Sequence, residues 1–271
     1  MVRKHIEFVD TQVLPWQPVS LPGIDGNALQ KLLSEDDETG AATMLLGLPA
    51  GWQQATAGFR SVATEIFVLR GDLTAGSTRL IDGCYSYIPA GMAHGPLASV
   101  QGCLALIMFA GRPDFVAGET SKANARLDQY IPCINSSEMP WSSARLEGPP
   151  PGILVKPLRS DPETHDWTWI SAVLPLWRED RAEIHPTVEE AFMLRGDTLL
   201  GERGVMRAGC YFWRPPNVPH GPMLSRTGGM WFFRTQGGGL EVTYTHPPNW
   251  EKLVKDYLYS GPLFPFTLPK E

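Results

Sequence analysis

The sequence predicts an all-β protein made of two tandem β domains. Three observations support this class: an internal repeat, many short apolar segments bounded by turn residues, and a high content of glycine and proline. The chain of 271 residues holds 27 glycines and 25 prolines, which suits a fold with many turns. Its hydrophobic fraction of 43% is enough for a substantial core.

The repeat becomes visible when the chain is compared with itself at a shift of 125 or 126 residues. The segment 65–72 (EIFVLRGD) corresponds to 190–197 (EAFMLRGD). Shorter matches follow in the same order: PW at 15–16 and 140–141, GCY at 83–85 and 209–211, and HGP at 94–96 and 220–222. Each repeat is long enough for its own domain, so we predict a first domain over residues 1–131 and a second over residues 132–271.

Short apolar segments in both halves are predicted strands. They cover residues 43–48, 65–69, 84–88 and 103–109 in the first repeat, and residues 167–174, 191–194, 211–213, 230–233 and 240–245 in the second. Many short strands with regular turns favour a sandwich or a barrel.

Few helices are expected. Asn249 is a good N-cap for a C-terminal helix, because apolar residues follow at helical spacing and Gly261 provides a stop. A weaker helix is predicted over residues 121–129. Residues 132–141 are predicted to be the linker that leads into the second repeat.

Composition argues against several classes of partner. The net charge is −6 and no run of Lys or Arg occurs, which disfavours nucleic acid and anionic membranes. Residues 1–10 lack the apolar run of a secretory signal, and the longest apolar stretch, 103–110, is too short to cross a bilayer. The four cysteines, Cys84, Cys103, Cys133 and Cys210, show no metal-like spacing, so we expect buried free thiols in a cytoplasmic protein.

The second repeat contains a candidate metal site. Glu183 and His185 are two residues apart on a predicted strand, so they point to the same face. Glu189 or Glu190 adds a carboxylate, and His220 follows a Pro-rich turn. Two histidines and one carboxylate can hold a divalent metal with open positions, as in non-haem iron oxygenases.

The order of these residues resembles the cupin family. Its usual pattern is His-x-His, then Glu, then Gly, and later Gly, Pro, Gly and His. The resemblance implies a bicupin, with two tandem jelly-roll β-barrels and few short helices. It also implies that His185, Glu189 and His220 anchor a metal, with Glu183 in the place of the first histidine. Glu189 fits the family spacing, whereas Glu190 fits the internal repeat, so both stay candidates.

Two catalytic roles follow for the carboxylates. Glu183 is either a fourth ligand or a general base, and Glu183 or Glu190 could move a proton. An extra carboxylate makes the site harder, which favours iron(II) or manganese(II), with zinc and nickel as alternatives.

Aromatic residues beside these strands are candidates for a substrate pocket, although such residues more often belong to the core. The candidates are Trp177, Phe192, Trp213 and Trp231.

The first repeat retains only part of the motif. Glu65 and His94 remain, but Gly58 and Arg60 stand at the positions of Glu183 and His185. Arg60 would repel a cation. We therefore favour a scaffold role for this half, with an anion pocket at Arg60 and His94 as the alternative.

Within cupins, the chain is similar to the group of the anti-sigma factor ChrR and the acetylacetone dioxygenases. The shared features are the Pro-Gly at 22–23 and 151–152, the Leu-Arg-Gly, and the His-Gly-Pro. This resemblance implies an iron-dependent or manganese-dependent dioxygenase for a small dicarbonyl, hydroxyketone or aromatic substrate. A cupin isomerase or cyclase, and a non-catalytic small-molecule-binding bicupin, are the alternatives. Cupins often form homodimers, so a dimer is expected.

Overall fold

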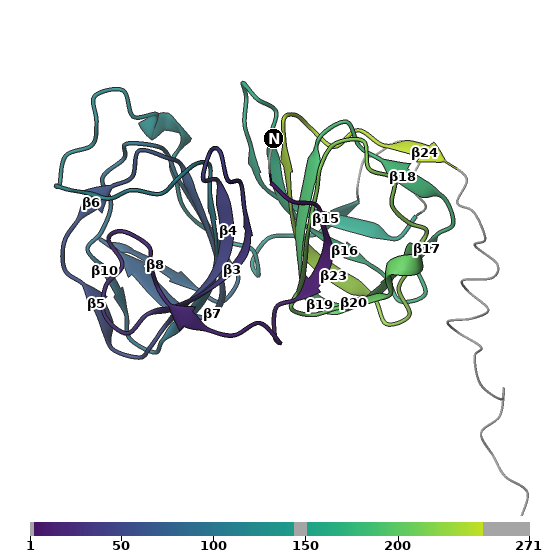
Figure 1. The fold of residues 1–271 in the computed structure, drawn as a ribbon, viewed down its shortest axis with the longest axis horizontal. Helices are drawn as coiled ribbons and strands as arrows, with labels where there is room; N and C mark the ends of the chain where they lie inside the picture. Colours follow the sequence, from purple (N-terminus) through teal and green to yellow (C-terminus); the bar gives the residue numbers. More distant parts are fainter. Residues whose placement is uncertain (1–2, 144–150, 246–271) are drawn as a thin grey trace, which may run out of the picture.

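The structure is a computed structural model that describes residues 3–143 and 151–245. Two β-barrels lie side by side, one from each half of the chain (Figure 1). Within these ranges the helical elements are two short 3₁₀ turns, η1 (Leu127–Gln129) and η2 (Gly201–Arg203). The predicted all-β class is confirmed.

Each repeat contributes the same series of strands. The first series is β1 (Ile6–Asp10), β2 (Gln17–Pro18), β3 (Leu29–Glu35), β4 (Ala42–Leu48), β5 (Trp52–Gln54), β6 (Gly58–Phe59), β7 (Thr64–Ala75), β8 (Thr78–Ile81), β9 (Cys84–Ile88), β10 (Leu97–Ser99), β11 (Cys103–Phe109) and β12 (Val116–Ala117). The second series is β13 (Ile131–Asn135), β14 (Ser142–Ser143), β15 (Ile153–Ser160), β16 (Trp167–Val173), β17 (Arg178–Glu179), β18 (Ala182–Ile184), β19 (Val188–Leu200), β20 (Val205–Arg207), β21 (Cys210–Arg214), β22 (Met223–Leu224), β23 (Gly229–Gln236) and β24 (Thr243–Thr245).

The large sheets of the two barrels have the same strand order. The first runs β13-β9-β7-β11-β4-β3-β2, and the second runs β1-β21-β19-β23-β16-β15-β14. In addition, β6 pairs with β12 and β18 pairs with β24. The repeat in the sequence is therefore a repeat of the whole strand topology.

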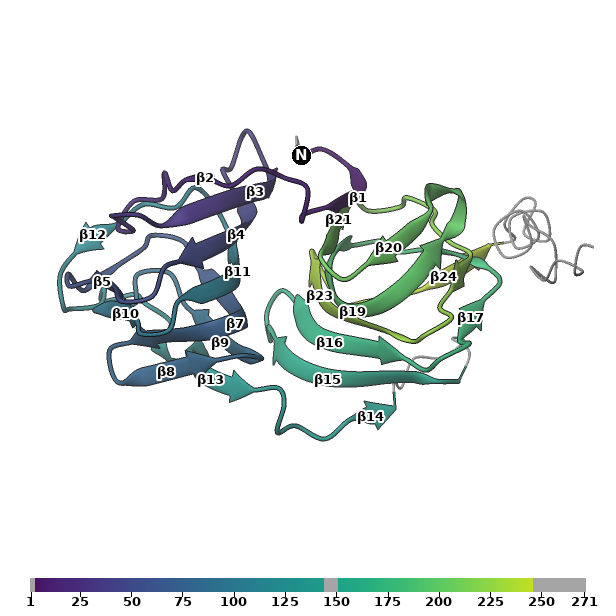
Figure 2. The same cartoon turned by 90° about the horizontal axis from the view of Figure 1, so that it is seen from below.

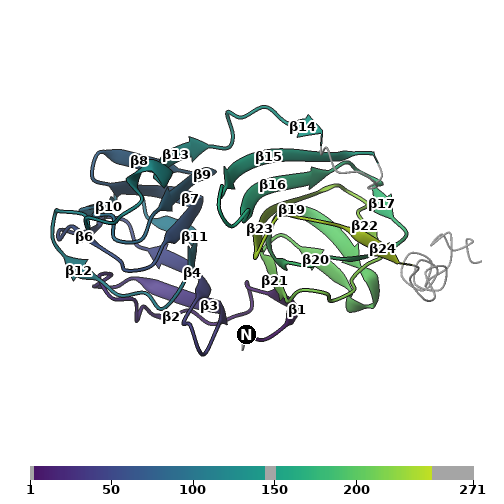
Figure 3. The ribbon, with the colours of Figure 1, turned by 90° about the horizontal axis from the view of Figure 1, so that it is seen from above.

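The two barrels exchange their first strands. Strand β1, at the start of the first repeat, pairs with β21 of the second barrel (Figure 2). Strand β13, at the start of the second repeat, pairs with β9 of the first barrel (Figure 3). The predicted linker over residues 132–141 is thus wrong in its first part, because β13 extends the first sheet. The boundary between residues 131 and 132 stays a prediction, but each large sheet draws strands from both sides of it.

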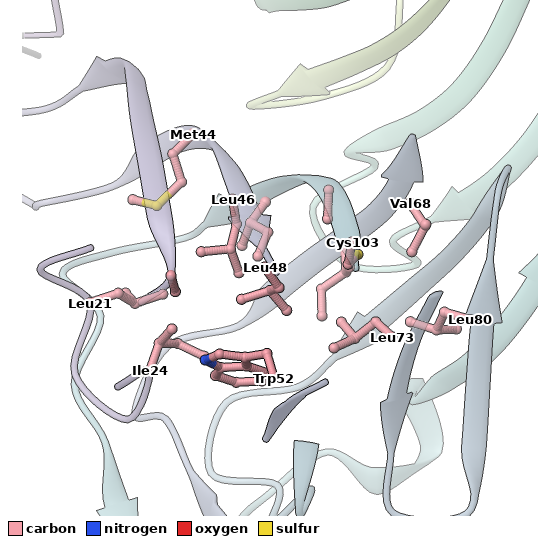
Figure 4. Close-up of a cluster of buried hydrophobic side chains, with 14 of the residues drawn as sticks. Leu21, Ile24, Met44, Leu46, Leu48, Trp52, Val68, Leu73, Leu80 and Cys103 are labelled. Carbon is pink, nitrogen blue, oxygen red and sulfur yellow. The ribbon is translucent and has the colours of Figure 1, made fainter. Parts of the chain in front are cut away.

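Apolar side chains fill the interior of the first barrel. Figure 4 shows Leu46, Leu48, Trp52 and Leu73 packed together there, and each is 5% exposed or less. The indole Nε1 of Trp52 donates to the carbonyl oxygen of Asp25 at 2.8 Å, so its one polar atom is satisfied. Burial of each such side chain contributes about 1.5–3 kcal/mol to stability.

A second apolar cluster joins the outer faces of the two large sheets. Successive strand residues point to opposite faces, so β7 turns Val68 inward and Phe67 outward. Phe67 packs against Phe232 of the second barrel, with ring centroids 5.0 Å apart. Phe192 and Trp213 join the same cluster from β19 and β21. The barrels therefore share a packed interface.

The helix predicted over residues 121–129 is wrong apart from η1. Lys122 donates its backbone N–H to Gly91 at 2.8 Å, and the Ser121 hydroxyl accepts from the N–H of Ala93 at 2.9 Å. These bonds attach the segment to a loop of the first barrel instead of closing helical turns. The helix predicted from Asn249 lies outside the described residues.

Two smaller sequence expectations can be compared with the structure. No helix in the described ranges is both long and apolar enough to cross a membrane. All four cysteines are free, and three are buried, while Cys133 is half-buried.

Candidate metal centre

The second barrel gathers two histidines and two glutamates at one end of its interior. Glu183, His185 and His220 each offer a ligand atom, and these atoms lie within 4.8 Å of one another. The Glu189 carboxylate lies 3.5 Å from His220 Nε2 and 3.9 Å from His185 Nε2. The structure thus brings together all four residues predicted as ligands.

Backbone pairing fixes the positions of these side chains. The N–H of Glu183 donates to the carbonyl of His220 at 2.8 Å, and the N–H of His220 donates back at 3.0 Å. The N–H of Asn217 donates to the carbonyl of His185 at 2.7 Å. On its other side β18 pairs with β24, where Glu183 lies opposite Tyr244. Regular strand geometry therefore places Glu183 beside His220.

Hydrogen bonds orient both imidazole rings. His185 Nδ1 lies 2.7 Å from the carbonyl oxygen of Glu241, and His220 Nδ1 lies 3.3 Å from that of Val218. A carbonyl only accepts, so each Nδ1 carries the proton and each Nε2 presents a lone pair to the centre. His185 Nε2 is buried and has no hydrogen-bond partner among the described residues. Such an outer carbonyl is the usual second contact of a metal-binding histidine.

A buried arginine completes the polar end of the barrel. Arg214 forms an ion pair with Glu189 through Nη1, and its Nη2 lies 3.0 Å from Glu7 on the exchanged strand β1. Arg214 is not among the residues predicted from the sequence. The repeat offered a signal, because Ile88 occupies the equivalent place in the first half.

The protonation states reflect burial and these charges. Burial, with help from Glu189 and Glu179, raises the pKa of Glu183 to about 8. Burial and then Arg214 lower the pKa of His220 to about 3. Burial also raises the pKa of Glu189, but the two histidines and Arg214 outweigh it and hold that pKa below its usual range.

A family model described as "Domain of unknown function (DUF4437)" matches residues 7–242. The chain belongs to the DUF4437 family. No curated protein sequence matches it.

Solved structures resemble this DUF4437 chain over most of its length. A proposed dioxygenase from Nostoc punctiforme matches with a TM-score of 0.83 and 24% identity, over 90% of this chain and 92% of that chain. A variant of oxalate decarboxylase from Bacillus subtilis matches with a TM-score of 0.60 and 12% identity, over 94% and 84%. The same enzyme at pH 4.6 matches with a TM-score of 0.57 and 11% identity, over 94% and 83%. These similarities confirm the cupin-type fold.

An apolar cavity of about 110 Å³ leads away from the metal-ligand cluster of this DUF4437 barrel. Glu183, Glu189, Arg214 and His220 form its polar end. Its walls are mainly aromatic and aliphatic: Trp167, Trp169, Trp177, Leu200, Met206, Phe212, Met223, Trp231, Phe233, Leu240, Val242 and Tyr244 all line it. Trp169 stacks between Trp167 and Phe233, at 4.2 and 5.1 Å between centroids.

Two of the four predicted pocket residues line this cavity, and two do not. Trp177 and Trp231 are in its wall. The prediction for Phe192 and Trp213 is wrong, because both point out of the barrel into the interface cluster. Alternation along β19 and β21 accounts for this, since Ala191 and Phe212 are the inward neighbours.

Glu190 also lies away from the centre, so its predicted place in the site is wrong. It faces the first barrel, and its carboxylate accepts from Tyr211 of β21 at 2.5 Å and lies 3.1 Å from Nη1 of Arg234 on β23. Thr43 of the first barrel also donates to it. Glu189 and Glu190 are adjacent in a strand, so only Glu189 reaches the barrel interior.

The candidate residues of the first barrel are not brought together in the same way. Glu65 faces the interface, 3.0 Å from Arg234 Nε. Arg60 donates to the carbonyl oxygen of Asp114 at 2.5 Å and lies over the ring of Phe115, 5.8 Å from its centroid. A Cβ at Gly58 would clash with that same ring. Phe115 therefore occupies the space where the second barrel has Glu183.

Burial in this filled interior shifts the pKa values of Arg60 and His94 in the first barrel. Burial lowers the pKa of Arg60 to about 10, although Asp114 opposes the shift. Burial also lowers the pKa of His94, although a hydrogen bond to the Met92 carbonyl opposes the shift. Within the described residues, the metal-ligand cluster found belongs to the second barrel.

Proposed function

We propose that this chain is a metal-dependent cupin enzyme of the dioxygenase type, acting on a small enolisable substrate in the second barrel. One observation carries the proposal: two oriented imidazole Nε2 lone pairs meet two carboxylates at the polar end of an apolar cavity. The buried and unpartnered Nε2 of His185 supports it most directly, because such an atom costs stability unless a ligand satisfies it.

The residues present fit a divalent metal ion. His185, His220 and Glu183 would hold it, as two histidines and one carboxylate do in non-haem iron sites. Glu189 is the fourth candidate ligand, held in place by Arg214. Oxygen and imidazole donors favour iron(II) or manganese(II). When bound, such an ion supplies a Lewis acid that polarises a substrate carbonyl and, for iron, one-electron chemistry with oxygen.

The charges at the polar end of the cavity would balance a divalent ion. With neutral histidines, the ionised Glu183, Glu189 and Glu7 and the cationic Arg214 sum to minus two, so a divalent ion would bring the sum to zero. Such a neutral centre would accept a diketone or hydroxyketone as the neutral ketone. The aromatic walls would hold the apolar part of such a molecule and exclude water, which strengthens the charge interactions.

Oxalate fits this cavity less well. It is a small dianion with no apolar part, while the walls of the cavity are mainly apolar. Arg214 is the cationic side chain at the polar end, and Glu189 and Glu7 already engage it.

The proposal is tested by oxygen uptake. Iron-loaded protein would be given acetylacetone or 2,4-dihydroxyacetophenone in an oxygen electrode, with product analysis by mass spectrometry. Uptake matched by carbon–carbon cleavage, and lost in His185→Ala, supports the proposal. His94→Ala is the matched control, because His94 ends the same motif in the first barrel. No uptake with any enolisable substrate would contradict it.

A metal-dependent isomerase or cyclase is the second candidate. For this reaction Glu189 and the two histidines would hold the ion, and Glu183, whose pKa burial raises to about 8, would stay free to give and take a proton. Rearranged product without oxygen uptake would identify this reaction. Binding of such compounds without turnover would indicate a non-catalytic binding protein.

A further inference from the structure

A second cavity, here called the interbarrel cleft, lies between the two barrels. This cleft is open to solvent, has a volume of about 560 Å³ and shares no lining residue with the cavity of the metal centre. Its lining consists largely of pairs related by the repeat, such as Lys31 with Lys156 and Trp16 with Trp141. The cleft therefore has two similar ends.

Each end holds a buried lysine. Lys31 and Lys156 are each 7% exposed. Their ammonium groups donate to the carbonyls of Thr11 and Ser136, at 2.8 and 2.7 Å. No carboxylate lies within ion-pair distance of either ammonium in the described parts of the chain. A buried ammonium retains further donors and charge that favour an anion.

An aromatic ring accompanies each lysine. Lys31 Nζ lies 4.6 Å from the ring centroid of Trp16, and Lys156 Nζ lies 4.4 Å from that of Trp141. These contacts hold each ammonium at the wall of the cleft without neutralising it. The arrangement is the same at both ends, so it is a property of the repeat.

The surface between the lysines is apolar. The first barrel supplies Leu45, Phe67 and Leu104, and the second supplies Ile170, Phe192 and Met230. Leu45, Phe67, Ile170 and Phe192 are each 5% exposed or less, so they form the packed apolar floor of the cleft, over which a hydrocarbon chain would lie.

The charge balance of the cleft is opposite to that of the chain. Four cationic residues line it, the two lysines with Arg70 and Arg195, against one carboxylate, Asp82. The sum is plus three, on a chain whose net charge is −6. Exposed arginines at the rim attract an anion, while the buried lysines can bind it.

Strand order gives the separation of the two ends. Lys31 is on β3, and Lys156 donates to Ser136, the residue directly after β13. Five strand intervals separate β3 from β13 in the first sheet, so the two ends lie about 24 Å apart measured along the curved sheet. The ligand must therefore be elongated to reach both lysines.

We infer that the interbarrel cleft binds an elongated organic dianion with an apolar middle and a carboxylate at each end. Each carboxylate accepts hydrogen bonds from one lysine, and the hydrocarbon middle lies across the apolar surface. No residue of the metal centre takes part, so this binding is independent of the proposed reaction.

The test is calorimetric titration of the full chain with dodecanedioate, and with 1,12-dodecanediol as the uncharged analogue. We expect one dianion per chain and binding of the diol at least tenfold weaker. Lys31→Gln and Lys156→Gln should each weaken dianion binding about tenfold or more, as for the loss of a charged hydrogen bond. Lys122→Gln is the matched control, because Lys122 lies over Phe59, 5.1 Å from its centroid and outside the cleft.

A second pair of variants keeps the test decisive if the lysine variants do not fold. Arg70 is exposed at the rim and Arg195 is its repeat partner, so Arg70→Gln and Arg195→Gln should fold normally. They should weaken dianion binding and reduce its dependence on salt. Three results would overturn the inference: no binding by wild type, equal binding of dianion and diol, or loss of dianion binding in His185→Ala.

Discussion

Glu7 and Arg214 lie 3.0 Å apart, carboxylate to guanidinium, although 207 positions separate them in the sequence. The exchange of β1 into the second barrel creates this contact. Arg214 in turn holds Glu189, which lies beside both histidines of the metal centre. The N-terminal strand is therefore part of the support of a site in the other half of the chain.

This contact can be tested with Glu7→Gln. Loss of the Glu7 charge leaves Arg214 with Glu189 alone and makes the centre more positive, so a divalent cation should bind about tenfold more weakly. Asp10→Asn is the control on the same strand, because the Asp10 carboxylate accepts from the backbone N–H of Gln12 at 2.9 Å and forms no ion pair with Arg214 in the described structure. Metal affinity is measured by competition with a chelator. Equal affinities for wild type and Glu7→Gln would show that the contact does not support the site.

Metal affinity should rise with pH up to about 8. Burial and neighbouring carboxylates raise the pKa of Glu183 to about 8. Below that pH the metal must displace a proton, so affinity should fall by up to tenfold for each pH unit. His220, with a pKa lowered to about 3, stays neutral in this range and adds nothing to the pH dependence of metal affinity. Glu183→Gln should remove the dependence. A wild-type affinity that is constant between roughly pH 6 and 8 would contradict this reasoning.

The polar network between the barrels should be sensitive to the loss of its cation. Arg234 lies 3.0 Å from Glu65 and 3.1 Å from Glu190, and all three are buried. Arg234→Met installs the residue found at the equivalent position, Met108, and leaves buried Glu65 without its ion-pair partner and Glu190 with Arg3 alone. We expect a loss of about 3–5 kcal/mol in the free energy of unfolding, measured with denaturant.

The control for that substitution is Arg226→Met, on an exposed turn. It should change stability by less than about 0.5 kcal/mol. If Arg234→Met were equally mild, the two carboxylates would not depend on Arg234.

Substitutions of two tryptophans should distinguish a residue that binds substrate in the cavity from a residue that stabilises the barrel interface. Trp177 lines the cavity, so Trp177→Leu should raise KM about tenfold and leave kcat nearly unchanged, because an apolar wall binds substrate and transition state alike. Trp213 belongs to the interface, so Trp213→Leu should lower thermal stability without changing KM. The reverse pattern would mean that substrate binds elsewhere.

The sequence predicts that both halves form the same series of strands, but it does not predict which strands pair with each other. A repeat at one spacing predicts that both halves have the same elements, and they do. The spacing is the same whether β1 joins its own barrel or the other one, so the exchange could not be inferred. Likewise, Pro132 and its neighbours resemble a linker in composition, although β13 forms ladder bonds there.

The site was predictable as a set of residues, but not in its orientation. Glu189 and Glu190 differ only in which face of β19 they occupy, and that depends on the pairing of β19 with β21 and β23. The sequence did not predict Arg214 as part of the site, because a strongly basic residue is not expected beside a cation site. Its function depends on Glu7, which only the folded chain brings near.

The most direct measurement is the metal content of four purified proteins after anaerobic loading with iron(II) or manganese(II). We predict about one ion per chain in wild type and in His94→Ala, and little or none in His185→Ala and His220→Ala. Circular dichroism confirms that each variant is folded. A folded wild type that retains no metal, or His185→Ala and His220→Ala variants that retain it fully, would contradict a metal centre in the second barrel.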